Sequence, residues 1–202
     1  MLLVRLLVLM TFIGCIGSGN RMLILGPQKS YSEYVQKYNS CTGKGMIDSN
    51  GPLKGKLSFT FKSQRDSTFF QFGDAIGRKA LLMWITPGTV TARNLIENKQ
   101  YDYDEIMEFL PFLKIMEPND ITEFIWGAEP SFKEKFKLVD RSIKKNIEIN
   151  FRSEKLNDEN REVVEAKFSD KESKQIVSIN VKNRSRKSEH VNMKKVWKLL
   201  KY

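Results

Sequence analysis

Short segments in which apolar and polar residues alternate dominate residues 43–103 and return after residue 147. In the plainest segment, Lys56-Leu57-Ser58-Phe59-Thr60-Phe61-Lys62, every second residue is apolar. This period predicts a strand with one buried and one solvated face. Further strands are expected at 69–72, 79–85, 89–93 and 99–103, with Gly and Pro at the turns between them. The succession predicts an antiparallel meander.

The middle of the chain breaks this pattern. Ile106, Phe109, Leu110 and Leu113 recur at helical spacing, and a second helix is indicated by Asp120-x-x-Glu123 ahead of an apolar run. Alternation then resumes at 147–151, 164–168 and 177–181, and irregularly at Val191, Met193 and Trp197. The chain is therefore expected to be mainly β (α+β), with helices at 104–127 inserted between two sets of strands.

The N-terminus has the features of an export signal that ends at a cysteine. Residues 6–13 are apolar but too few to cross a bilayer as a helix, which needs about 20 residues. The run ends at Phe12-Ile13-Gly14-Cys15, which resembles a bacterial lipobox, although Leu is usual where Phe12 stands. A cysteine placed there by chance is the alternative.

Lipidation of Cys15 would explain how the chain can have two cysteines without a disulfide. Two cysteines in an exported chain suggest a disulfide, but an acylated Cys15 has no thiol to give, which leaves Cys41 free and buried. We therefore expect a signal peptide at 1–14, a lipidated tether at 15–29 and one folded domain at 30–202. Ile16 in place of Asp favours the outer membrane over inner-membrane retention.

The net charge of +10 raises the possibility of an anionic partner. The excess lies in residues 133–202, which hold 20 Lys and Arg against 11 acids, whereas residues 102–129 hold eight acids and one base. The bases alternate with apolar residues, as on a solvated sheet face, and no nucleic-acid motif stands beside them. We expect no nucleic-acid partner.

Catalytic motifs are missing from the sequence. His190 is the only histidine, it has no nucleophile-elbow sequence to serve, and one histidine with one spare cysteine cannot complete a zinc site. The carboxylates at 102–108 could supply an acid and a base for work on an envelope glycan, but they are more simply the wet face of a helix. No enzyme activity, metal or cofactor is expected, apart from the diacylglycerol and acyl chain on Cys15.

The order of strands, helices and strands behind a lipobox resembles the LolA/LolB superfamily over roughly residues 30–200, and its lipoprotein branch LolB in particular. Asp74-Ala75-Ile76-Gly77 matches a turn that ends in Leu-Gly in LolB proteins. Residues 113–118 and Phe124-Ile125-Trp126-Gly127-Ala128-Glu129-Pro130 resemble the segment that ends in Trp-Ile-x-Gly-x-Pro, with Phe124 in place of Trp and one inserted residue.

The resemblance implies an incomplete antiparallel barrel whose apolar concave side is covered by a helical lid. It implies a lipoprotein on the periplasmic face of the bacterial outer membrane, a monomer that takes acylated lipoproteins from a soluble LolA-like carrier and inserts them. Ile76 would contact the membrane. The expected lipid-binding residues are Leu57, Phe59, Phe61, Phe70, Phe72, Leu82, Trp84, Phe109, Leu110, Phe124 and Ile125.

Two alternatives remain at this stage. Each of these apolar residues is also explained by plain core packing. In the first alternative the same fold is a sensor or a structural interaction module of the envelope, whose cavity is filled or inessential. In the second it is a carrier of other lipids.

Overall fold

The computed structural model describes residues 27–51, 54–74, 76–109, 111–132, 136–137, 141–156 and 160–200. The predicted signal peptide and Cys15 lie outside the described residues. The fold is one antiparallel sheet whose strands follow the order β6-β5-β4-β3-β2-β1-β9-β8-β7. The strands are β1 (Ser40–Asn50), β2 (Gly55–Gln64), β3 (Ser67–Gly73), β4 (Lys79–Thr86), β5 (Thr89–Asn94), β6 (Lys99–Tyr101), β7 (Ile147–Lys155), β8 (Arg161–Asp170) and β9 (Gln175–Lys187).

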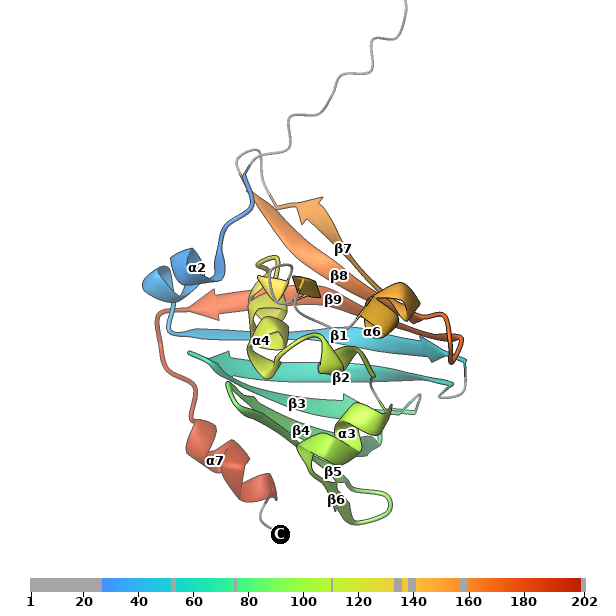
Figure 1. The fold of residues 1–202 in the computed structure, drawn as a ribbon. Helices are drawn as coiled ribbons and strands as arrows, with labels where there is room; N and C mark the ends of the chain where they lie inside the picture. Colours follow the sequence, from blue (N-terminus) through green and yellow to red (C-terminus); the bar gives the residue numbers. More distant parts are fainter. Residues whose placement is uncertain are drawn as a thin grey trace, which may run out of the picture.

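The sheet curves without closing, because β6 and β7 remain at its two edges (Figure 1). The predicted fold class, a mainly β chain that forms an incomplete antiparallel barrel with inserted helices, is therefore confirmed. Strand β1 pairs with β9, and this pairing of the two longest strands joins the first meander to the second. One continuous sheet thus serves both halves of the chain.

The hairpin turns alternate between two ends of the sheet, because every strand pair is antiparallel. Pairings of Ser58 with Gly73 and of Leu81 with Asn94 place the β3–β4 and β5–β6 turns at one end, here called the Ile76 end. The β1–β2 and β8–β9 connections lie at the same end. The β2–β3, β4–β5 and β7–β8 turns lie at the other end, here called the Leu156 end.

Two glycines of β1 allow aromatic rings to cross the sheet on its concave face. Gly43 pairs with Phe61 and Gly45 with Phe59 in the β1–β2 register. A Cβ on Gly43 would meet ring carbons of Phe61 at 2.6 Å, closer than side chains tolerate. The register with β9 also shifts between Lys44 and Gly45, which marks a bulge. Bulges and glycines of this kind bend a sheet.

The chain segment between β6 and β7 forms helices, and these helices cover the concave face of the sheet (Figure 1). They are α3 (Tyr103–Phe109), the 3-10 turn η2 (Pro111–Lys114), α4 (Pro118–Trp126) and α6 (Arg141–Asn146), and α2 (Tyr31–Lys37) precedes β1. Helix α4 begins at Pro118 and is capped after Trp126 by Gly127, whose φ of 93° is the left-handed conformation that glycine adopts easily. Within the part of the chain that the structure describes, no helix is long and apolar enough to span a bilayer.

The C-terminal segment differs from the prediction. Val191, Met193 and Trp197 were expected on a strand, but the structure forms α7 (Met193–Trp197) and η3 (Lys198–Leu200). The Asn192 side chain accepts a hydrogen bond from the Lys195 amide and so caps the helix. Val196 packs with Phe69, Leu82 and Trp84 on the convex face of the sheet. Helical spacing brings Met193 and Val196 onto the same apolar patch, which explains why tertiary contact overrides the weak alternation.

The crossing of Phe61 over Gly43 gives a stability prediction. Gly43→Ala should lower the free energy of unfolding by about 1–3 kcal/mol, because the ring and the strand must shift to make room for the methyl group. Gly55→Ala is the matched control, since nothing lies within 4 Å of its Cβ position. Urea unfolding followed by circular dichroism measures both variants. Equal stability of the two would contradict the account.

Candidate functional site

An open apolar cavity of about 480 Å³ lies between the concave face of the sheet and α3. Its walls come from seven strands, the β1–β2 turn and helix α3. The lining residues are Ile47, Ser49, Lys54, Gly55, Leu57, Phe72, Leu81, Met83, Ala92, Tyr101, Ile106 and Val177. Ser49, Lys54, Gly55 and Leu81 belong to strand ends and turns at the Ile76 end, so the cavity opens there.

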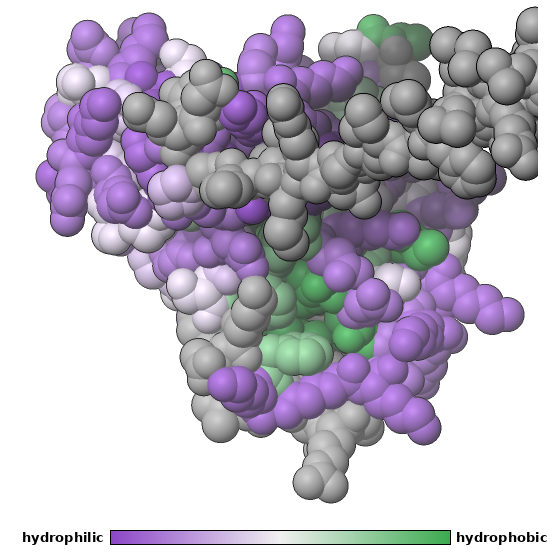
Figure 2. All heavy atoms as spheres, turned by 90° about the horizontal axis from the view of Figure 1, so that it is seen from above, coloured by the Kyte–Doolittle hydropathy of each residue, from purple (hydrophilic) through white to green (hydrophobic). Residues whose placement is uncertain are grey.

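The character of the cavity is that of a site for an apolar ligand. Among its lining side chains, hydrogen-bonding groups are limited to Ser49, Lys54 and Tyr101. The volume falls in the range of about 300–1,000 Å³ that small-molecule sites occupy. Figure 2 shows hydrophobic side chains gathered in a hollow that hydrophilic side chains surround. Such a space suits a hydrocarbon chain held by shape and hydrophobicity rather than by directed polar contacts.

The other half of the concave face is filled. Ile121, Phe124 and Ile125 of α4 approach Phe59 and Phe70, and the space left between them is only about 50 Å³. Neighbouring aromatic rings are in contact, with ring centroids of Phe59 and Phe70 5.6 Å apart in an edge-on arrangement. Helix α4 therefore covers the half of the concave face nearer the Leu156 end. The open cavity lies over the half that α4 does not cover.

Six of the residues predicted to bind lipid lie in these two regions. Leu57 and Phe72 line the open cavity. Phe59, Phe70, Phe124 and Ile125 line the small space beneath α4, and Phe72 touches both spaces. Phe61 is 1% exposed and belongs to the packed core. Leu110 and the side chain of Phe109 lie outside what the structure describes.

The assignment of Leu82 and Trp84 to the cavity is wrong. Both side chains lie on the convex face, in a cluster with Phe69 and Val196, and the ring centroid of Trp197 lies 3.8 Å from that of Trp84. Strand β4 is apolar on both faces, so alternation alone cannot tell which set faces the helices. The alternate residues Leu81 and Met83 line the cavity.

Several cavity residues were not among the predicted ones. Ile47 continues the alternation of Gly43 and Gly45 on β1, and glycine hides that pattern from a hydrophobicity count. Ala92 and Tyr101 lie on short strands with little apolar signal. Ile106 was part of the helical stripe of α3 and could have been assigned to the site by that stripe.

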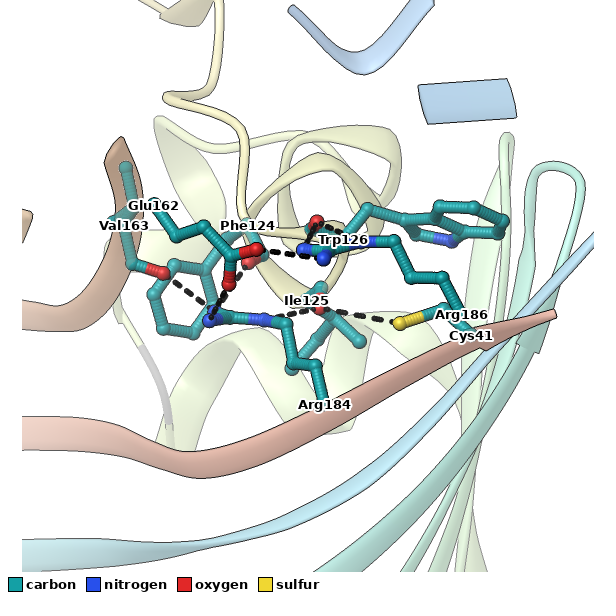
Figure 3. Close-up of polar contacts among 8 residues, drawn as sticks. All are labelled: Cys41, Phe124, Ile125, Trp126, Glu162, Val163, Arg184 and Arg186. Carbon is teal, nitrogen blue, oxygen red and sulfur yellow. Dashed lines mark hydrogen bonds and ion pairs between the residues drawn. The ribbon is translucent and has the colours of Figure 1, made fainter. Parts of the chain in front are cut away.

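Two arginines of β9 hold the C-terminal end of α4 (Figure 3). Arg184 donates from Nε to the carbonyl of Ile125 at 2.8 Å and from Nη2 to that of Phe124 at 3.1 Å. Arg186 donates to the carbonyl of Trp126. The last carbonyls of a helix have no partner within the helix, and cations are favoured at that end of its dipole. The arginines satisfy both requirements.

Glu162 of β8 completes this group, here called the arginine clamp (Arg184, Arg186 and Glu162). Its carboxylate lies 2.6 Å from Nη1 of Arg186 and 3.4 Å from Nη1 of Arg184, and all three side chains are at most 10% exposed. Burial lowers the pKa of Arg184 to about 10, against the effect of the Glu162 charge. Arg186 also lies 4.1 Å from the ring centroid of Tyr34 of α2.

A chain of buried hydroxyl groups ties α4 to β2 and β3 as well. The indole of Trp126 donates to Ser63 at 2.8 Å, and Ser63 hydrogen-bonds to Thr68, which hydrogen-bonds to Thr122. Cys41 lies beside this region with its thiol directed at the Ile125 carbonyl, and burial raises its pKa to about 11. Helix α4 is thus fixed to the sheet by polar contacts on both sides.

Ile76 lies at the tip of the β3–β4 turn and is 75% exposed. The turn itself is ordered by Asp74, whose Oδ1 accepts from the amides of Ile76 and Arg78 and whose Oδ2 pairs with Arg78 Nε at 2.7 Å. The Arg78 hydrogen bond in particular holds the pKa of Asp74 below its usual range. The structure therefore places Ile76 in solvent, at the end where the cavity opens.

No cluster of three or more His, Cys, Asp or Glu side chains that could hold a metal ion occurs in the described residues.

The arginine clamp predicts a large effect from one carboxylate. Glu162→Leu should lower the free energy of unfolding by about 3–5 kcal/mol, because it leaves two buried guanidinium groups without their counter-ion. Glu165→Leu on the same strand is the control, since its partner Arg152 is half exposed and the loss should stay below about 1 kcal/mol. Chemical denaturation of both variants makes the comparison. Similar losses would show that the clamp does not hold α4.

No protein-family model matches the sequence, and no curated protein matches it significantly. Among solved structures, the fold is similar to the crystal structure of a DUF1329 family protein from Desulfovibrio piger. The two share 12% sequence identity with a TM-score of 0.48, and the similarity covers 80% of this chain and 91% of that one.

Proposed function

We propose that this protein is a LolB-like acceptor that shields acyl chains in its open cavity and delivers acylated lipoproteins into the outer membrane. In this proposal Cys15 carries the lipid anchor, the domain faces the periplasm, and a soluble carrier of the LolA type supplies the cargo. The reaction needs no covalent step and no cofactor. The observation that carries the proposal is an unfilled apolar cavity of about 480 Å³ that opens to solvent.

The energetics of the cargo demand such a cavity. Each methylene moved out of water is worth about 0.8 kcal/mol, so a chain of about 16 carbons left in water costs on the order of 10 kcal/mol. An acceptor must offer the chain an apolar environment before its donor lets go. Leu57, Phe72 and Met83 supply that environment on the concave face.

The fixed position of α4 indicates the route of entry. Lifting α4 from the sheet would break the hydrogen bonds of Arg184 and Arg186 and expose the buried Glu162. Entry at the Ile76 end needs none of these losses, because the cavity is already open there. We therefore infer that the acyl chain enters and leaves between α3 and the strand ends beside Ile76.

The lipid anchor sets a limit on how this end reaches the bilayer. Residue 28 pairs with Arg161 at the start of β8, so the described chain begins near the Leu156 end. Twelve peptide units from Cys15 to Pro27 span at most about 40 Å when extended, and a strand of 11 residues such as β1 spans about 37 Å. The tether is thus just long enough to run the length of the sheet.

The cavity predicts a loss of ligand when it is filled. Leu57→Trp should weaken binding of a fluorescent 16-carbon fatty acid about tenfold or more, because the indole occupies space that the chain needs. Leu199→Trp adds the same group on the exposed C-terminal segment and should leave binding unchanged. Fluorescence titration measures both. If the unaltered protein binds no acyl probe, the cavity serves a different purpose, such as that of a sensor.

The turn at Ile76 predicts a separate defect. Ile76→Glu should leave folding and acyl binding intact but block insertion of lipoprotein into vesicles, because a charged tip cannot enter the apolar layer. Ile76→Leu keeps the apolar tip and should retain insertion. A transfer assay from a loaded carrier to phospholipid vesicles separates the two variants. Normal insertion by Ile76→Glu would refute the role of this residue.

A further inference from the structure

We propose that Ile96, on the β5–β6 turn, is a second bilayer contact that acts together with Ile76, so that two adjacent hairpin tips dock the cavity mouth onto a phospholipid surface. The role of this docking in lipoprotein delivery rests on the proposed function, whereas the docking itself does not depend on cargo. Nothing in the LolB resemblance points to Ile96.

Exposure sets these two side chains apart. Among the described residues, Ile76 at 75% and Ile96 at 68% are the most exposed large apolar side chains. Leu156 at 60% is the next, and it lies at the opposite end of the sheet. Single exposed apolar residues are ordinary, but two at neighbouring tips of one end form a surface that favours an apolar partner.

The two turns are built alike. Asp74 Oδ1 accepts a hydrogen bond from the Ile76 amide at 3.1 Å, and Asn94 Oδ1 accepts one from the Ile96 amide at 2.9 Å. Asn94 also accepts from the amide of Glu97 at 3.1 Å. Each isoleucine therefore stands two residues after a capping side chain that orders the turn. Ordered tips hold their apolar side chains in solvent and have little conformational freedom to lose on insertion.

The tips flank the mouth of the cavity. Strand β4 begins at the first turn and the neighbouring strand β5 ends at the second, and Leu81 near the start of β4 lines the cavity and pairs with Asn94. The β3–β4 and β5–β6 hairpins are two strand spacings apart, which is about 10 Å. A bilayer that accepts both isoleucines would lie against the opening, and an acyl chain could pass between cavity and membrane without crossing water.

The charges around the tips suit anionic headgroups. Exposed bases near the two tips are Lys54, Lys56, Arg78, Lys79 and Lys99, and the β8–β9 turn at the same end adds Lys171 and Lys174. Lys56 pairs with Asp48, Arg78 with Asp74 and Lys99 with Glu105. No carboxylate of the described residues lies within ion-pair distance of Lys54 or Lys79. These two ammonium groups are free to meet lipid phosphates, and we therefore assign the surface to a bilayer that contains anionic phospholipid.

The test places an environment-sensitive label at each tip of the full-length chain. Cysteine variants Ile76→Cys, Ile96→Cys and Leu156→Cys are made with Cys15→Ser and labelled with NBD, while Cys41 is 0% exposed and stays unlabelled. Vesicles contain phosphatidylethanolamine with one fifth phosphatidylglycerol. Labels at 76 and 96 should shift to the blue and be quenched by spin labels on the lipid acyl chains. The label at 156 should do neither.

A second set of variants tests the energetic contribution. Ile96→Asp should weaken vesicle binding about tenfold, whereas Ile96→Val and Leu156→Asp should change it little. A label at 96 that stays in water while that at 76 enters the lipid would overturn the proposal for Ile96. Protection of position 96 by a protein partner without lipid quenching would overturn it too. Failure of the protein to bind an acyl probe would instead refute the proposed function and leave the docking result standing.

Discussion

The arginine clamp determines how the concave face of the sheet is used. Arg184 and Arg186 bind the last carbonyls of α4, and Glu162 balances their charges in a buried setting. Unpaired, these groups would be costly to bury, so the three residues and the helix end hold one another in place. Because α4 is fixed toward the Leu156 end, its apolar face fills only that half of the sheet. The open cavity is the half that α4 does not cover.

This division separates stability from binding within one sheet. The aromatic side chains under α4 form the core, and the aliphatic side chains near the Ile76 end are left in contact with an open space. Apolar surface that stays unburied does not contribute to stability, but it provides a binding surface for a hydrocarbon ligand. In the proposed function, the hairpin tips at the same end would bring that place next to the membrane.

Much of the fold could be predicted from the sequence because alternation is a local property. The segment around Leu57 and Phe59 identifies its strand and its buried face, and helical spacing identifies the insert. The face used by β4 could not be predicted, since Leu81 and Leu82 are equally apolar and the helices that pack on the two faces of the sheet decide between them. The clamp was also missed. Arg184 and Arg186 alternate along β9 as the residues of a solvated face do, and their burial depends on a helix 60 residues earlier.

Photo-crosslinking of the cavity tests the central claim most directly. The full-length protein would be incubated with a 16-carbon fatty acid that carries a diazirine near its methyl end, irradiated, and mapped by peptide mass spectrometry. The account predicts crosslinks on the concave face at Ile47, Leu57 or Met83, which line the cavity on three different strands. Crosslinks confined to the convex cluster around Trp84, or none above those of denatured protein, would contradict it.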